Sequence, residues 1–132
     1  MSTFSSTEEA KECFKNDRFA AANGMHLDEI GEGCASASMT LGPGHLNANG
    51  GIMGGVIFTL ADLAFAAACN NVHRPTVASQ VSISYLAAPK REKLFAHAQC
   101  IKDGRTTGVY HVEVTDDTGR QIALFIGHAH KL

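Results

Sequence analysis

One acidic residue, Asp62, lies in the middle of an otherwise apolar segment. It is the only Asp, Glu, Lys or Arg between Glu32 and Arg74. A buried carboxylate is costly unless it is paired or neutralised, and loss of contact with water raises its pKa. Such a group can act as a general base or nucleophile near neutral pH, or it can be a structural acid that caps or pairs with a neighbouring backbone group. Asp62 taken alone fits both roles equally.

A glycine-rich stretch before this segment supplies further candidate groups. The sequence GPGHLNANGG over 42–51 predicts a loop, and Met53, Gly54 and Gly55 stand where the next helix is expected to begin. The first N–H groups of a helix have no intrahelical acceptor, and glycine lets a ligand approach them closely. With the helix dipole, they can hold a developing oxyanion. Asn47 in the loop could orient a water or a carbonyl; a flexible hinge and an ordinary loop asparagine are the alternatives.

The spacing between Gly54 and Asp62 predicts a site that two chains share. The eight positions between them are slightly over two helical turns, so Asp62 lies about 12 Å further along the helix axis. One chain does not easily aim both groups at one carbon atom, whereas two antiparallel helices in a dimer can. We therefore expect a homodimer in which Gly54 of one subunit faces Asp62 of the other.

The chain predicts a single domain over residues 1–132 with two helices. The longer one, over 54–69, is apolar almost all round and has sixteen residues. A membrane span needs about 20 apolar residues, so a buried core helix is expected and no membrane contact. A peripheral helix is expected over 7–22, capped by Thr7 and ended by the Asn-Gly pair that follows.

Six segments of the chain predict antiparallel strands. Residues 25–41 predict two strands joined by a turn at 31–33, and four more segments follow Pro75 with no helix between them. Asp-Gly at 103–104 and Asp-Thr-Gly at 117–119 are typical hairpin turns. The fold class is therefore α+β, with a sheet of about five or six strands curled around the long helix. The other face of the sheet is apolar enough to pair with another subunit.

Composition excludes several kinds of partner and cofactor. Hydrophobic residues make up 45% of the 132 residues and the net charge is −2 without a basic run, which gives nucleic-acid binding little support. The N-terminus has no apolar core of a signal peptide, so we expect the cytoplasm. Four scattered cysteines without a C-x-x-C pair predict reduced, mostly buried thiols and no zinc or redox centre. His128 and His130 alternate on one strand, but without a third ligand we expect no metal site.

Three stretches of the chain together match the pattern of a known family. The first is N-x6-G-G-x5-A-D, here Asn47, Gly54-Gly55 and Ala61-Asp62; the others are VASQVSISYLAAP and DGRTTGVYHVEVTDDTGRQIALFIGHAHKL. From about residue 25 onward the chain resembles the hotdog-fold acyl-CoA thioesterases of the phenylacetate-pathway type. The resemblance implies hydrolysis of an aryl- or medium-chain acyl-CoA to a free acid and coenzyme A. It implies no cofactor besides the coenzyme A of the substrate, and homodimers that pair into tetramers.

The resemblance also implies roles for individual residues. Asp62 would activate water or attack as a carboxylate, the Gly54 amide would polarise the thioester carbonyl, and Asn47 would hold the water or the substrate. The family usually has histidine immediately before the two glycines. This chain has Met53 there, and methionine neither donates a hydrogen bond nor carries a proton. The residue four positions after the acid, sometimes a hydroxyl in relatives, is Ala66.

Basic residues at strand ends are candidates for holding the phosphates of coenzyme A. Lys102 is one of them, and Arg105 in GRTTGVY is the first choice; solvated turns explain these residues about as well. The expected contacts to the substrate are Met53, Gly55, Lys90, Arg91, Arg105 and Thr106.

Two other functions are open on the same fold. His45 and Asp62 could serve as acid and base of an enoyl-CoA hydratase or dehydratase, although a solvent-facing loop histidine is the more ordinary interpretation of His45. A non-catalytic module that binds acyl-CoA is the other alternative, and Met53 favours it. Free thiol released from a thioester would distinguish the hydrolase from both.

Overall fold

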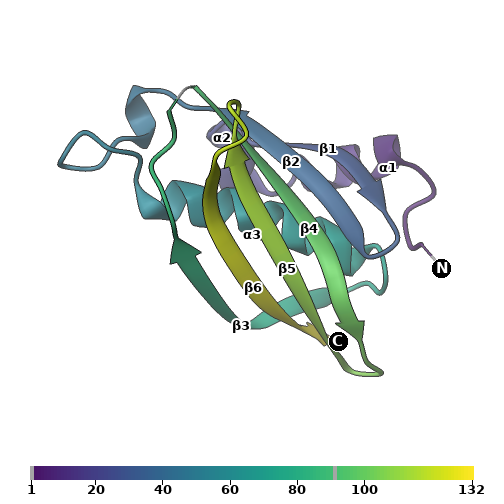
Figure 1. The fold of residues 1–132 in the computed structure, drawn as a ribbon. Helices are drawn as coiled ribbons and strands as arrows, with labels where there is room; N and C mark the ends of the chain where they lie inside the picture. The colour runs from purple at the N-terminus through teal and green to yellow at the C-terminus, as the bar shows by residue number, and fades with distance from the viewer. Residues whose placement is uncertain (1, 91) are drawn as a thin grey trace.

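A computed structural model of the chain describes residues 2–90 and 92–132 (Figure 1). Within them, one six-stranded antiparallel sheet curls around the long helix α3, Gly54–Asn70. The strand order across the sheet is β1-β2-β4-β5-β6-β3. The strands are β1 His26–Gly31, β2 Cys34–Thr40, β3 Thr76–Tyr85, β4 Lys93–Asp103, β5 Thr107–Asp116 and β6 Gln121–Lys131. The expected hotdog architecture is confirmed.

Helix α3 packs its small and aromatic residues against the concave face of the sheet. Phe65 meets Tyr110 edge-on at 5.6 Å between ring centroids. Gly127 of β6 makes room for Phe65, because a Cβ atom there would lie 2.6 Å from the phenyl ring. This close approach fixes the rotation of α3 about its axis. The side chains of α3 that stay half-exposed include Thr59 and Asp62, one helical turn apart.

The N-terminal region differs from the expected single helix over 7–22. It forms two helices, α1 Thr7–Phe14 and α2 Arg18–Ala22. The break falls at Lys15-Asn16-Asp17, where the Asp17 N–H bonds to the Phe14 carbonyl at 3.1 Å. Asn and Asp favour helix ends over helix interiors because their side chains compete for backbone groups. Ser6 rather than Thr7 caps α1, because its hydroxyl accepts from the Glu9 N–H at 3.1 Å.

The cysteines also differ from expectation, since only Cys69 is buried. Cys13 is exposed, and Cys34 and Cys100 are half-buried; all four are free thiols. Burial raises the pKa of the Cys69 thiol to about 12, so it is protonated at neutral pH. In the described part of the chain, no group of three or more His, Cys, Asp or Glu side chains could hold a metal ion. No described helix is long and apolar enough to cross a bilayer.

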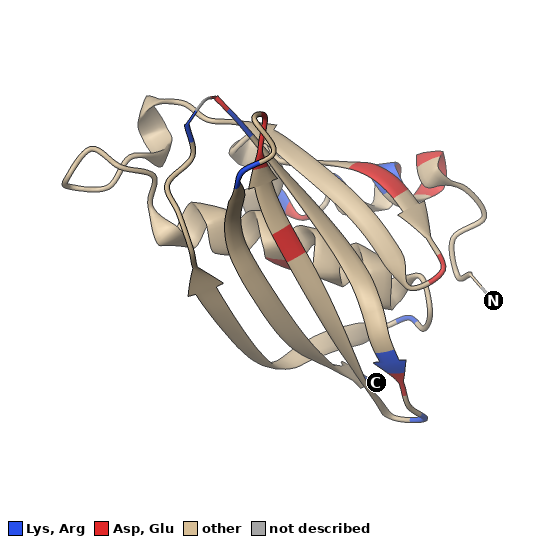
Figure 2. Ribbon diagram, in the orientation of Figure 1, with Lys and Arg blue, Asp and Glu red and all other residues tan. Residues whose placement is uncertain are grey.

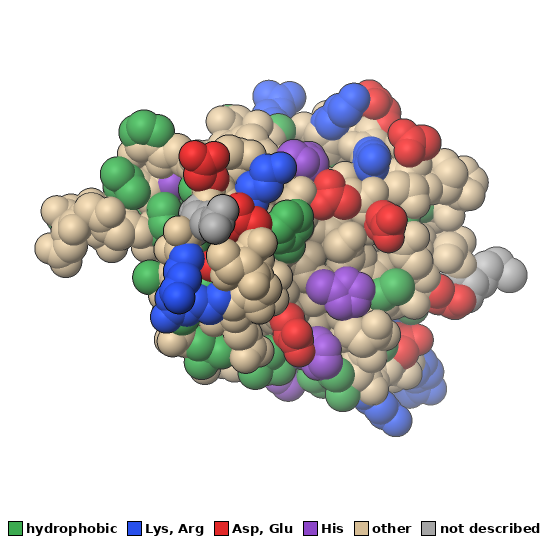
Figure 3. All heavy atoms as spheres, turned by 45° about the horizontal axis from the view of Figure 1, so that its top comes forward, with side chains coloured by type: hydrophobic (Ala, Val, Ile, Leu, Met, Phe, Trp, Pro, Cys, Tyr) green, Lys and Arg blue, Asp and Glu red, His purple; other side chains and the backbone are tan. Residues whose placement is uncertain are grey.

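Charged residues gather at the turns and on the N-terminal elements, and the middle parts of the strands carry few of them (Figure 2). The loop between β2 and α3 projects beyond the sheet (Figures 1 and 3). The fold therefore presents a projecting loop before α3 and a sheet whose strands carry few charged residues in their middle parts.

Candidate active site

The start of α3 opens into a hollow of about 500 Å³. The hollow lies between the β2–α3 loop and the segment that follows β3, and its lining residues include Asn47, Gly54, Tyr85 and Leu86. In the described part of the chain, the N–H groups of Gly54 and Gly55 have no acceptor. Two amide donors at the positive end of a helix dipole thus remain available to an incoming carbonyl oxygen.

Tyr85 packs against the backbone at Gly54. Its hydroxyl donates a hydrogen bond to the Gly54 carbonyl at 3.0 Å. A Cβ atom on residue 54 would lie 3.1 Å from the Tyr85 ring and from its hydroxyl oxygen. The tyrosine therefore packs directly on the backbone of the first helical turn and holds its amide groups in place.

Asn47 stabilises the loop through its Oδ1 atom, and its Nδ2 group is available as a hydrogen-bond donor. Its Oδ1 accepts from the N–H groups of Asn49 at 2.9 Å and Gly51 at 3.1 Å. Its backbone N–H donates to the Gly51 carbonyl at 2.7 Å. The loop is thus held by its own hydrogen bonds, which argues against a free glycine hinge. The Asn47 Nδ2 atom has no acceptor among the described residues, so toward the hollow the side chain offers a donor.

Asp62 lies in a different hollow, of about 320 Å³, between α2 and α3. Its side chain is half-buried, and burial, followed by the nearby charge of Asp17, raises its pKa. Within residues 2–90 and 92–132, its carboxylate has no hydrogen-bond or ion-pair partner. A desolvated acid without a partner is poised to take up a proton.

The two hollows have no lining residue in common. Asn47 and Gly54 line one, and Asp62 lines the other. A single chain therefore keeps the expected base apart from the expected oxyanion donor, in agreement with the helix-rise argument.

The other expected contacts are divided over the molecule. Met53 is 55% exposed and lines neither hollow, although its N–H donates to the His45 carbonyl at 2.9 Å. Lys90 is exposed directly after Pro89, which lines the Gly54 hollow. Arg105 and Thr106 are exposed in the β4–β5 turn, at the opposite end of β5 from the segment that holds Lys90. Arg91 lies outside the described residues.

His45 is buried rather than facing solvent. Its Nδ1 accepts a hydrogen bond from the Gly42 N–H at 2.9 Å, so the ring helps to close the loop. His45 lines neither of the two hollows, and the pairing with Asp62 that a hydratase would need is absent from the described chain.

Sequence reasoning missed Tyr85, Asp17 and Asp116. Buried Asp116 accepts four hydrogen bonds: from the N–H groups of Lys90, Thr118 and Arg120 and from the Thr118 hydroxyl, at 2.6 to 3.0 Å. These bonds hold its pKa well below the usual range, with that of the Thr118 hydroxyl the largest cause. The DDTG turn was a visible signal for Asp116, since aspartate often bonds to the backbone of a turn.

The fold is that of the thioesterases. The model of the thioesterase superfamily matches residues 49–123, and the chain belongs to this family of thioester hydrolases. It is 36% identical over 126 residues to the acyl-coenzyme A thioesterase PaaI of Escherichia coli K12, a match that covers 95% of this chain and 90% of that protein. The predicted family is confirmed.

Solved structures of thioesterase-type proteins have the same fold as this chain. The structure of the E. coli PaaI protein from the phenylacetic acid degradation operon has a TM-score of 0.88 and 34% identity, covering 97% of this chain and 96% of that one. A hypothetical thioesterase protein from Streptococcus pneumoniae, solved with coenzyme A, has a TM-score of 0.80 and 26% identity, covering 89% and 94%.

Proposed function

We propose that this protein hydrolyses acyl-CoA thioesters at a site shared by two copies of the chain. Asp62 of one copy faces Gly54 and Asn47 of the other. The observation that carries the proposal is the division of complementary groups between two hollows: an unpartnered carboxylate in one and unpaired helix-start amides in the other. Among the described residues, the Asp62 hollow lacks the expected oxyanion donor, Gly54, and the Gly54 hollow lacks the expected base, Asp62.

Exposed apolar side chains around both hollows support a second copy as the cover. They are Phe19 beside Asp62, and Leu46, Met53, Tyr85 and Leu86 around the start of α3, each 49% to 69% exposed. Large apolar groups gathered on a surface mark an interaction site. Strand β3 is also an edge strand, which leaves one row of its backbone groups available for pairing.

The reaction divides between these groups as follows. Asp62 takes a proton from a water molecule while the water oxygen bonds to the thioester carbon. The Gly54 N–H donates to the carbonyl oxygen as that oxygen gains negative charge, and the Asn47 Nδ2 group orients the water or the carbonyl. The tetrahedral intermediate then collapses, the C–S bond breaks, and the sulfur of coenzyme A leaves with the proton. Direct attack by Asp62 to give an anhydride, opened afterwards by water, uses the same residues.

The substrate we infer is an aryl- or medium-chain acyl-CoA. Ile52, Ile57 and Leu86 line the Gly54 hollow and suit an apolar acyl group. Lys90 stands at its rim and suits a phosphate of coenzyme A. Arg105 and Thr106, at the far end of the sheet, would reach a phosphate only from another protomer, in the dimer or in a pair of dimers.

A thiol-release assay with a panel of acyl-CoA esters tests the proposal. We expect turnover of aryl- or medium-chain esters by the parent and its loss in Asp62→Asn. Gly54→Pro removes the amide at a helix position that tolerates proline, whereas Gly54→Ala keeps the amide and adds a methyl group. Proline should therefore reduce kcat more than alanine does. Tight binding of acyl-CoA without thiol release would contradict hydrolysis.

Mixed oligomers test whether the site is shared. Asp62→Asn and Gly54→Pro chains, each inactive alone, are unfolded together and refolded in equal amounts. A mixed dimer then has one site with both defects and one intact site, so roughly a quarter of the parent activity should return. No recovery would place the whole site within one chain.

A further inference from the structure

The hollow beside Asp62 contains a second carboxylate, that of Asp17. Helix α2 supplies one wall and α3 the other. The lining residues are Asp17, Arg18, Phe19, Ala20, Thr59, Asp62 and Leu63. Asp62 of α3 and Asp17, the N-cap residue of α2, thus line the same hollow.

The side chain of Asp17 does not cap the helix that it precedes. It is the N-cap residue of α2, where an aspartate side chain ordinarily accepts a hydrogen bond from the helix backbone. Its side chain makes no such bond, and nothing in the described part of the chain pairs with it. Asp17 is exposed, and the part of its surroundings that excludes water raises the pKa of its carboxyl group.

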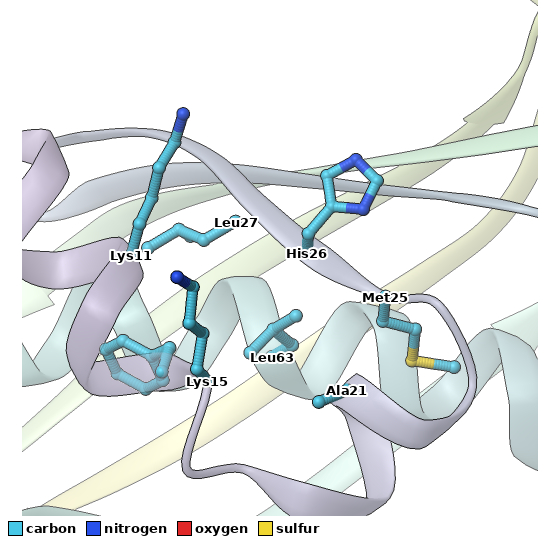
Figure 4. A pocket seen from close by; sticks show the side chains of 8 residues that line it. Lys11, Lys15, Ala21, Met25, His26, Leu27 and Leu63 are labelled. Carbon is cyan, nitrogen blue, oxygen red and sulfur yellow. The ribbon is translucent and has the colours of Figure 1, made fainter.

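Packing fixes Asp17 relative to α3. Leu63, next to Asp62, is 4% exposed and lines another cavity of about 210 Å³, together with Ala21 and Met25. Figure 4 shows these three side chains where α2 crosses α3. In α2 the buried residue is Ala20, which is 5% exposed and lines the Asp62 hollow together with Leu63, so the helix that Asp17 caps packs beside Asp62.

We propose that Asp17 is a positioning residue for the hydrolysis inferred above, on which this proposal rests. From α2 its carboxylate shares the hollow of Asp62, repels the Asp62 charge and makes Asp62 a stronger base. Like charges in a confined site disfavour ionisation of both, and a general base works best when its pKa lies near the working pH. The charge of Asp17 is, after burial, the second cause that raises the pKa of Asp62.

The other titratable groups near Asp62 do not cancel this effect. Arg18 lines the hollow but forms no ion pair with either acid in residues 2–90 and 92–132. Cys69 on α3 is neutral at pH 7. Lys11 of α1 and Lys15, the C-cap residue of that helix, line the cavity beyond Leu63 (Figure 4). The described strands supply no side chain to the hollow.

The test is Asp17→Asn, which keeps the shape and removes the charge. We expect the acidic limb of the kcat/KM profile to move about half a pH unit lower, with an unchanged or higher Tm. Asp17→Glu, which keeps a carboxylate at this position, should have the same kcat/KM profile as the parent. Asp117→Asn, at an exposed acid of the β5–β6 turn, is the matched control and should leave the profile where it is.

Carboxyl ¹³C NMR follows Asp62 directly, with its signal assigned from its absence in Asp62→Asn. A lower Asp62 pKa in Asp17→Asn supports the proposal, and an unchanged one overturns it. Because this titration needs no turnover, a parent protein that releases no thiol contradicts the proposed function alone.

Discussion

Two aspartates withdrawn from bulk water, Asp62 and Asp116, have opposite environments. Asp116, at the end of β5, accepts four hydrogen bonds and its pKa is lowered. Asp62, in the middle of α3, accepts none from the described residues, has Asp17 for a neighbour, and its pKa is raised. Burial acts on both, so hydrogen-bond donors decide the sign.

The difference separates an acid that holds the fold from one that is available for chemistry. Asp116 joins the β5–β6 turn to the Lys90 backbone and so supports the wall of the Gly54 hollow formed by residues 85–89. The Asp62 carboxylate forms no hydrogen bond or ion pair within the described chain. An unpaired, half-buried charge lowers stability, and the role of base that we propose for Asp62 would account for its presence.

The largest effect should follow from Asp62→Asn. Removing a general base reduces kcat by about 10²- to 10⁴-fold. The Tm should stay the same or rise, because an unpaired charge leaves the half-buried site. Thiol release and thermal unfolding by circular dichroism measure the two quantities. A variant as active as the parent would remove Asp62 from the mechanism.

Asp116→Asn should lower the stability of the protein and leave its activity nearly unchanged, the reverse of Asp62→Asn. The amide cannot replace a carboxylate that accepts four hydrogen bonds, so the Tm should fall by several degrees while activity per folded molecule changes little at 25 °C. Thermal unfolding beside Asp117→Asn, the exposed neighbour, measures the effect. An equal Tm in the two variants would mean that the four bonds do not stabilise the fold.

The pH dependence should separate the two acids without ambiguity. Asp62 has a raised folded pKa, so activity should be lost as pH falls through a value above the ordinary aspartate pKa of about 3.9. Asp116 has a lowered folded pKa, so its stabilisation is complete above about pH 3.9 and is lost as pH falls through the lower folded value. A kcat/KM profile and Tm values across the acid range should therefore show activity failing first. Simultaneous loss would indicate that activity reports unfolding.

The smallest effect should come from Tyr85→Phe. It removes the hydrogen bond to the Gly54 carbonyl and keeps the ring that packs on the helix start. We expect kcat to fall a few-fold, with KM and Tm nearly unchanged, since one hydrogen bond is worth about 1 kcal/mol. Steady-state kinetics on the preferred ester measures it. A large rise in KM would instead place the hydroxyl in substrate binding.

The candidate site was predictable where its signals are local. Asp62 is an isolated charge in an apolar run, Gly54 begins that run, and Asn47 stands in the loop before it. Tyr85 could not be found in this way, and neither could the bond between Asp116 and Lys90, whereas the local turn signals the bonds of Asp116 to Thr118 and Arg120. The partners of Tyr85 and Asp116 in the distant contacts lie 31 and 26 positions away in the chain, and no local periodicity encodes contacts at such separations.

The sequence by itself determined the long helix, the strand segments and the isolation of Asp62, because periodicity and the cost of burying charge act over a few residues. Only the tertiary structure decided that α2 lies against α3 beside Asp62, and that Asp62 and Gly54 open into separate hollows. Those outcomes depend on which surfaces meet when the sheet curls around α3, and packing across the whole chain sets that.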